Sequence, residues 1–162
     1  MVVAQFKSGK STLIGNLLRS LVDGDRFLGH ADVVRLSGTA ILLDTEMHQS
    51  TLDDWLEAQR IACDDRIIRL SLKGSLGSFD LLDDEMRAAW AARLRQYAVE
   101  YLILDNMRPV LDVHGLDEHH DVGRFLVAFD TLQREAQISE ACIVHHMGHL
   151  SERARGGALN SE

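Results

Sequence analysis

The stretch Ala4-Gln5-Phe6-Lys7-Ser8-Gly9-Lys10-Ser11 decides how this chain is expected to fold. It matches the phosphate-loop pattern G-x-x-x-x-G-K-[ST] except at its first position, where Ala4 replaces glycine. In this pattern, backbone N–H groups surround nucleotide phosphates, the lysine adds positive charge at the β and γ phosphates, and the serine hydroxyl reaches Mg²⁺. We therefore predict that this loop, together with Thr12, binds a nucleotide. Ala4 is a departure, because alanine is harder than glycine to place where φ is positive.

The residues on either side of the loop support this interpretation. Met1, Val2 and Val3 can form the end of a strand, and residues 13–18 continue as a helix. The N-terminus of such a helix faces bound anions. The alternative is a Gly/Ser turn before an ordinary helix, but the order of strand, loop and helix favours the phosphate loop.

Composition limits the class of protein. The chain has 162 residues, of which 46% are hydrophobic and 26% charged, as is typical of one soluble globular domain over residues 1–162. No apolar run approaches the ~20 residues of a membrane span, and no signal peptide is recognisable, so we expect a cytoplasmic protein with reduced thiols at Cys63 and Cys142. The net charge of 17 − 25 = −8 argues against a protein that coats nucleic acid. A ring with basic residues facing a central channel stays open.

Short apolar runs alternate with stretches of helical periodicity along the chain. The predicted strands cover residues 38–44, 66–72, 101–105 and 141–146. The predicted helices cover residues 51–62, with Ser50 or Thr51 as the cap, then 84–97 and 120–136. This alternation predicts an α/β fold, in which a mostly parallel sheet is flanked by helices on both faces. Ligands of such sheets bind at the carboxyl ends of the strands.

Acidic residues follow two of the predicted strands. Asp105 ends the run 101–104, where a carboxylate can hold the water shell of Mg²⁺. Glu46 follows the strand 38–44, where a carboxylate can orient the water that attacks a γ-phosphate. Asp44 is suited either to Mg²⁺ or to holding Glu46 in place. The alternative is that these acids only form turns and cap the next helix.

Histidines end the last predicted strand. His145 or His146 could donate a hydrogen bond to a γ-phosphate and respond to its loss. A metal site with His149 and the pair His119/His120 is an alternative, although no zinc-type spacing supports it. Ordinary polar residues at a strand end are a third possibility.

Two arginines, Arg153 and Arg155, lie in a Gly-rich segment after that strand. An arginine there could reach a neighbouring subunit's site as a finger that stabilises transition-state charge. A solvated basic turn explains the same residues equally well.

The combination of these segments resembles a known family. The chain joins its phosphate loop to LLDTE (42–46), YLILD (101–105), IVHHMGH (143–149) and RARGGAL (153–159). Together they resemble the RecA-like P-loop ATPases of the RepA/DnaB replicative-helicase type, especially the RepA-like AAA-family ATPases of actinobacteria, phages and plasmids. The resemblance implies an ATP-hydrolysing, helicase-like factor in DNA replication or repair. It also implies a homo-oligomeric ring, often a hexamer, with ATP sites between subunits and single-stranded DNA as a partner.

The resemblance also implies roles for individual residues. Lys10 and Ser11 would hold phosphate and Mg²⁺, Glu46 would be the catalytic carboxylate, and Asp105 the second acidic motif. His146, with His145, would sense the γ-phosphate, and Arg155 would be the finger in trans.

Some features depart from the family pattern. RGGA at 155–158 replaces the Arg-Gly-Ser-Ser-Ala form, the first strand is short, and the family's sheet continues beyond Glu162. We therefore expect a domain truncated at both ends. This leaves a second function open, a nucleotide-binding regulatory or partner module, or an inactive fragment, without motor activity. A small-molecule kinase would need an arginine-rich lid, whereas Arg108 is the single arginine of residues 106–120. If the protein binds DNA, we expect the contacting loops within residues 108–119.

Overall fold

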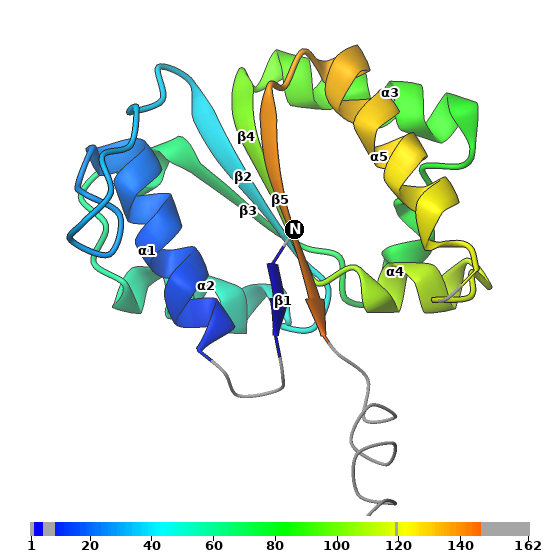
Figure 1. Ribbon diagram of the computed structural model, residues 1–162, viewed down its shortest axis with the longest axis horizontal. Helices are drawn as coiled ribbons and strands as arrows, with labels where there is room; N and C mark the ends of the chain where they lie inside the picture. Colours follow the sequence, from blue (N-terminus) through cyan, green and yellow to red (C-terminus); the bar gives the residue numbers. More distant parts are fainter. Residues whose placement is uncertain (1, 5–8, 119, 147–162) are drawn as a thin grey trace, which may run out of the picture.

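A five-stranded sheet organises the chain (Figure 1). The computed structural model describes residues 2–4, 9–118 and 120–146. The strands are β1 (Val2–Ala4), β2 (Thr39–Asp44), β3 (Ile67–Ser71), β4 (Val99–Asp105) and β5 (Glu140–His146). Their order across the sheet is β1-β5-β4-β2-β3, and all neighbouring pairs are parallel. The predicted α/β class with a parallel sheet is thus confirmed.

Helices cover both faces of this sheet. They are α1 (Lys10–Asp23), α2 (Gln49–Ala58), α3 (Asp84–Gln96), α4 (Arg108–Val113) and α5 (Val122–Ala136). Short 3-10 turns at Asp64–Arg66 and Leu76–Ser78 flank β3. Figure 1 shows α1 and α2 on one face, and α3, α4 and α5 on the other. Parallel strands require crossover connections of this kind, because the chain must return to the same end of the sheet before the next strand begins.

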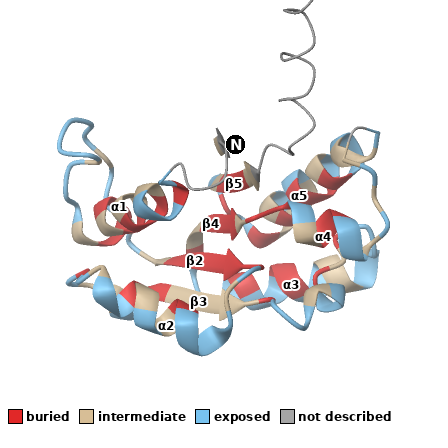
Figure 2. Ribbon diagram, turned by 90° about the horizontal axis from the view of Figure 1, so that it is seen from below, coloured by how far each residue is buried: buried red, intermediate tan, exposed pale blue. Residues whose placement is uncertain are grey.

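The central strands separate two apolar cores. Along β2, Ala40 and Leu42 face the core under α1 and α2, whereas Ile41 and Leu43 face the core under α3 and α5. β4 alternates in the same way, with Ile103 on the first side. Buried residues accordingly concentrate on the strands and on the helix faces that meet them (Figure 2). Each fully buried leucine contributes about 1.5–3 kcal/mol, so these two cores fix the register that aligns the strand ends.

The helix α2 differs from its predicted bounds at both ends. His48 is the N-cap residue, so Ser50 and Thr51 lie inside the first turn and neither caps the helix as predicted. The helix ends at Ala58 because Arg60 adopts a φ of 53°, which an α-helix does not accommodate. The predicted end at residue 62 is therefore wrong, although Ile61 is buried as its apolar spacing indicated.

The segment after β4 also differs from the sequence analysis, which assigned no helix there. Residues 108–113 form the short helix α4, with Pro109 in its first turn, where the missing N–H has no intrahelical role. Val110 and Leu111 are buried against the core under α3 and α5. Within the described ranges, none of the helices has the length and apolar character needed to cross a membrane.

Candidate active site

The start of α1 offers a site for an anion. Gly9 precedes the helix with φ 83°, a conformation that favours glycine, and provides no side-chain cap. The first turn has no acidic side chain, and Ser11 and Thr12 are exposed there. The N–H groups in the first turn of a helix have no intrahelical acceptor, and a helix N-terminus is for this reason a common place for an anion to bind. Among the other predicted loop residues, Ala4 ends β1 and residues 5–8 lie outside the described part of the chain.

Lys10 lies in this first turn and is only 7% exposed. Burial raises the pKa of Asp105 at the end of β4, and the positive charge of Lys10 partly offsets that rise. The first turn of α1 and the end of β4 therefore lie close enough to interact electrostatically, as the phosphate-loop interpretation requires.

A tight turn after β2 fixes the backbone of Glu46. Asp44 is 2% exposed, and its Oδ1 accepts hydrogen bonds from the N–H groups of Glu46 (2.9 Å) and Met47 (2.6 Å). Burial raises the pKa of Asp44, and these two N–H groups oppose that rise. Of the two roles left open for Asp44, this geometry supports the positioning of Glu46. A role toward Mg²⁺ stays a prediction.

Hydrogen bonds join the residues at the ends of β2 and β4. Asp44 pairs with Asp105 in the parallel register, and the N–H of Thr45 donates to the Asp105 carbonyl at 2.8 Å. The next peptide bond, Asp105–Asn106, is cis. The Thr45 hydroxyl donates to the Asn106 carbonyl and accepts from the Asn106 N–H, both at 3.0 Å. These hydrogen bonds join the two strand ends into one platform.

Asn106 connects this platform to the predicted catalytic carboxylate. Its side chain Nδ2 donates to Glu46 Oε1 at 2.8 Å, and its Oδ1 accepts from the Arg108 N–H at 3.0 Å. Asn106 is 1% exposed, whereas its partners Glu46 and Arg108 are exposed residues, so both of its side-chain bonds are partly buried. Asn106 is a functional residue that sequence reasoning missed. An amide directly after the acidic strand end was the only signal that could have indicated it.

The platform concentrates negative charge. Burial raises the pKa of Asp105 to about 7, and the nearby carboxylates of Asp44 and Glu46 contribute to that rise, with Lys10 opposing them. These charges mark the three predicted acids as one electrostatic group. A divalent cation would relieve their repulsion, and oxygen is the ligand type that Mg²⁺ prefers.

The donor set fits a shared cation better than a protein-only metal centre. No group of three or more His, Cys, Asp or Glu side chains in the described ranges could hold a metal ion. Mg²⁺ characteristically takes one or two protein oxygens and completes its shell with waters and substrate phosphates. The described residues thus give no support to the alternative histidine metal site, whose members His119 and His149 lie outside them.

His145 lies at the same edge, at the end of β5. Its Nε2 is 2.8 Å from Glu118 Oε1, and the other oxygen of Glu118 is 2.6 Å from Arg108 Nη1. The Nδ1 atom of His145 is buried and has no hydrogen-bond partner among the described residues. Glu118 is a second residue that sequence reasoning missed. The side chain of His146 and all of Arg155, both predicted site residues, lie outside the described part.

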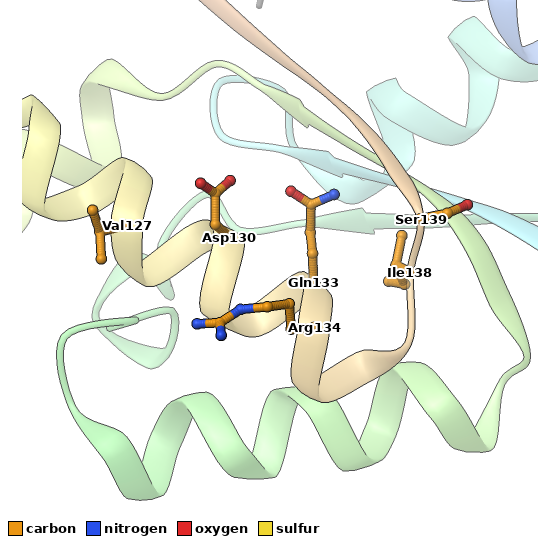
Figure 3. Close-up of a pocket in the computed structure, with 6 residues that line it drawn as sticks. All are labelled: Val127, Asp130, Gln133, Arg134, Ile138 and Ser139. Atoms are coloured by element: carbon orange, nitrogen blue, oxygen red, sulfur yellow. The ribbon is translucent and has the colours of Figure 1, made fainter.

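Among the described residues, one hollow lies close to these strand ends and another lies away from them. The first, of about 300 Å³, lies between α1 and β5 and is mostly apolar, with Lys10, Cys142 and Tyr101 in its wall. Burial there raises the pKa of Tyr101 to about 12. The other, of about 490 Å³, is an open depression beside α5 and the segment before β5 (Figure 3). Its lining includes Asp130, Arg134 and Ser139, none of which is a predicted site residue. The larger of these two hollows is therefore remote from the acidic platform, and its volume does not mark the site.

Comparison with known proteins supports the phosphate-loop interpretation. The family model of the AAA domain matches residues 1–152. A search among curated proteins gave no match. The family match thus spans every described residue of the candidate site.

Proposed function

Because this chain belongs to the AAA domain family of nucleotide-binding ATPases, we propose that it hydrolyses ATP at the carboxyl edge of its sheet and acts as a helicase-like factor in DNA replication or repair. The observation that carries the proposal is that Lys10, Glu46 and Asp105 meet although they are far apart in sequence. Asp105 is in register with Asp44, whose side chain binds the Glu46 N–H, and the charge of Lys10 acts on Asp105. A site for a triphosphate needs these parts: a cation for the phosphates, a carboxylate for the metal's water shell and one for the attacking water.

The residues take distinct roles in this proposal. The N–H groups at the start of α1 and the Lys10 ammonium bind the phosphates. Ser11 would hold Mg²⁺ and Asp105 its water shell, and the ion would supply positive charge to the phosphate oxygens. Glu46 accepts a proton from a water molecule as the water oxygen bonds to the γ-phosphorus. The bond from that phosphorus to the bridging oxygen breaks, which releases ADP and phosphate.

Two further roles concern the γ-phosphate. His146, together with His145 at the end of β5, is proposed to respond to its departure. Arg155 is proposed to stabilise transition-state charge in the site of an adjacent subunit of a ring. Such a ring would couple hydrolysis to rearrangement of its subunit interfaces, because each nucleotide state favours a different arrangement.

Substitutions in the purified protein test the ATPase proposal. Lys10→Ala is expected to weaken Mg-ATP binding at least about tenfold, since a buried cation is removed from the phosphate site. Glu46→Gln is expected to bind ATP like the parent and to lose turnover about 100-fold or more. Glu57→Gln, the same change at an exposed position of α2, is the matched control and should behave like the parent. A parent protein that neither binds nor hydrolyses Mg-ATP would refute the proposal.

A nucleotide-binding partner module without motor activity is the second candidate, and the net charge of −8 favours it. The two functions differ in their response to single-stranded DNA. A helicase-like motor should hydrolyse ATP faster when such DNA is added, whereas the partner module should bind ATP with negligible turnover under both conditions. Measuring turnover with and without DNA at low salt therefore separates them.

A further inference from the structure

A continuous series of contacts joins the ends of three neighbouring strands. It runs from Glu46 Oε1 to Asn106 Nδ2 (2.8 Å) and from Asn106 Oδ1 to the Arg108 N–H (3.0 Å). It continues from Arg108 Nη1 to Glu118 Oε2 (2.6 Å) and from Glu118 Oε1 to His145 Nε2 (2.8 Å). The proposed base after β2 and the histidine on β5 are thus linked through the segment that follows β4.

Asn106 is held in a single orientation at the centre of this series. Thr45 binds the backbone N–H and carbonyl of Asn106, and the residue is almost fully buried. Its side-chain amide is held at both atoms, at Nδ2 by Glu46 and at Oδ1 by the Arg108 N–H, so turning it away would leave a buried amide unpaired, which is costly. The Nδ2 donor is therefore fixed in direction, and it fixes one oxygen of Glu46 in turn.

Glu118 is shared between two partners. One of its oxygens faces Arg108 and the other faces His145, so a change at either partner alters the charge balance at the other. Arg108 also lies 3.6 Å from Asp112 through its Nε, one turn further along α4. Through Arg108, the first turn of α4 is thus connected to Glu46 at one end of the series and to His145 at the other.

We propose that Asn106 and Glu118 are positioning residues: Asn106 orients Glu46 for the attacking water, and Glu118 links that pair, through Arg108, to His145. This inference rests on the proposed ATPase function and extends it. Neither residue needs to touch the nucleotide. If loss of the γ-phosphate moved the side chain of His145, the movement would be transmitted to Glu46 through this series of contacts.

The first test exchanges the polarity of one hydrogen bond. Asn106→Asp keeps the shape and the acceptor for Arg108 but turns the donor facing Glu46 into a carboxylate oxygen. Turnover is expected to fall about 10- to 100-fold at saturating Mg-ATP, with KM within about twofold, because the base and not the nucleotide is misplaced. Gln96→Glu makes the same amide-to-acid change at an exposed position at the end of α3 and should match the parent.

The second measurement does not depend on hydrolysis. In the nucleotide-free protein, Asn106→Asp should lower the melting temperature by about 3–6 °C. In a Glu46→Gln background the new amide can donate to the introduced carboxylate, so the same change should lower the melting temperature clearly less there, with burial and repulsion by Asp105 accounting for the remaining loss. Equal losses in both backgrounds would show that the two side chains do not interact and would overturn the inference.

Glu118→Gln tests the link to His145. It removes the charge that binds Arg108, and turnover should fall about fivefold or more, with less than additive loss when combined with Asn106→Asp. Additive losses would overturn the link. Normal turnover by Asn106→Asp in an active parent would overturn the positioning role alone. A parent with no turnover would refute the ATPase proposal and the catalytic part of this inference together, whereas the melting data would still report on the contact.

Discussion

Asp105 lies where the sheet concentrates negative charge. Its carboxyl group is largely buried at the end of β4, beside Asp44 and Glu46, and these conditions raise its pKa to about 7. The folded protein therefore binds this proton more tightly than the unfolded chain does, where the pKa is near 3.8. The contribution of the group to stability is full below the unfolded pKa and is lost as the pH rises through about 7.

Replacing this group should consequently stabilise the nucleotide-free protein at alkaline pH. The amide introduced by Asp105→Asn cannot be charged, so we expect a gain on the order of 2 kcal/mol over the parent at pH 8, in EDTA, that shrinks toward pH 4. Urea unfolding at several pH values measures it. Asp54→Asn, at an exposed position of α2, should show no such trend. A pH-independent difference for Asp105→Asn would contradict the charge cluster.

The helix α5 ends at a residue whose backbone is left-handed. Gln137 follows the helix with φ 61° and ψ 33°, and its N–H bonds to the carbonyls of Gln133 and Arg134. The left-handed region is unfavourable for residues with a Cβ atom and open to glycine.

Glycine at this position should therefore stabilise the protein. We expect Gln137→Gly to raise the free energy of unfolding by about 0.5–1 kcal/mol, because relief of the left-handed conformation exceeds the added flexibility of the unfolded chain. Gln137→Ala retains the Cβ atom and is the control that should give no gain. Denaturant unfolding of the three proteins decides between relief of strain and simple loss of the side chain.

The long elements could be predicted because their apolar periodicity extends over several turns or a whole strand. α4 could not, since six residues are fewer than two helical turns and only Val110 and Leu111 face the core. The early end of α2 depends on the φ of Arg60, which no pattern encodes. Contacts of Asn106 depend on the register of β2 against β4, because its partner Glu46 is 60 residues away.

At the scale of the whole molecule, the order of the strands brings Lys10, Glu46 and Asp105 of one chain together at the carboxyl ends of the strands. The proposed ring adds Arg155 from a neighbouring subunit, so a complete site would combine groups of two chains. Head-to-tail contacts form a ring when the rotation between neighbouring subunits closes, and each subunit would then contribute to two sites.

This arrangement predicts complementation between two inactive variants. Arg155→Ala subunits keep Glu46, and Glu46→Gln subunits keep Arg155. In mixed rings, about one interface in four would pair an intact acidic edge with an intact arginine, so mixing the two proteins should restore a comparable fraction of parental turnover. Lys10→Ala mixed with Glu46→Gln is the control and should stay inactive, because both groups belong to the same edge of one chain. No recovery in the first mixture, when subunits are shown to exchange, would argue that the arginine acts within its own subunit or has no catalytic role.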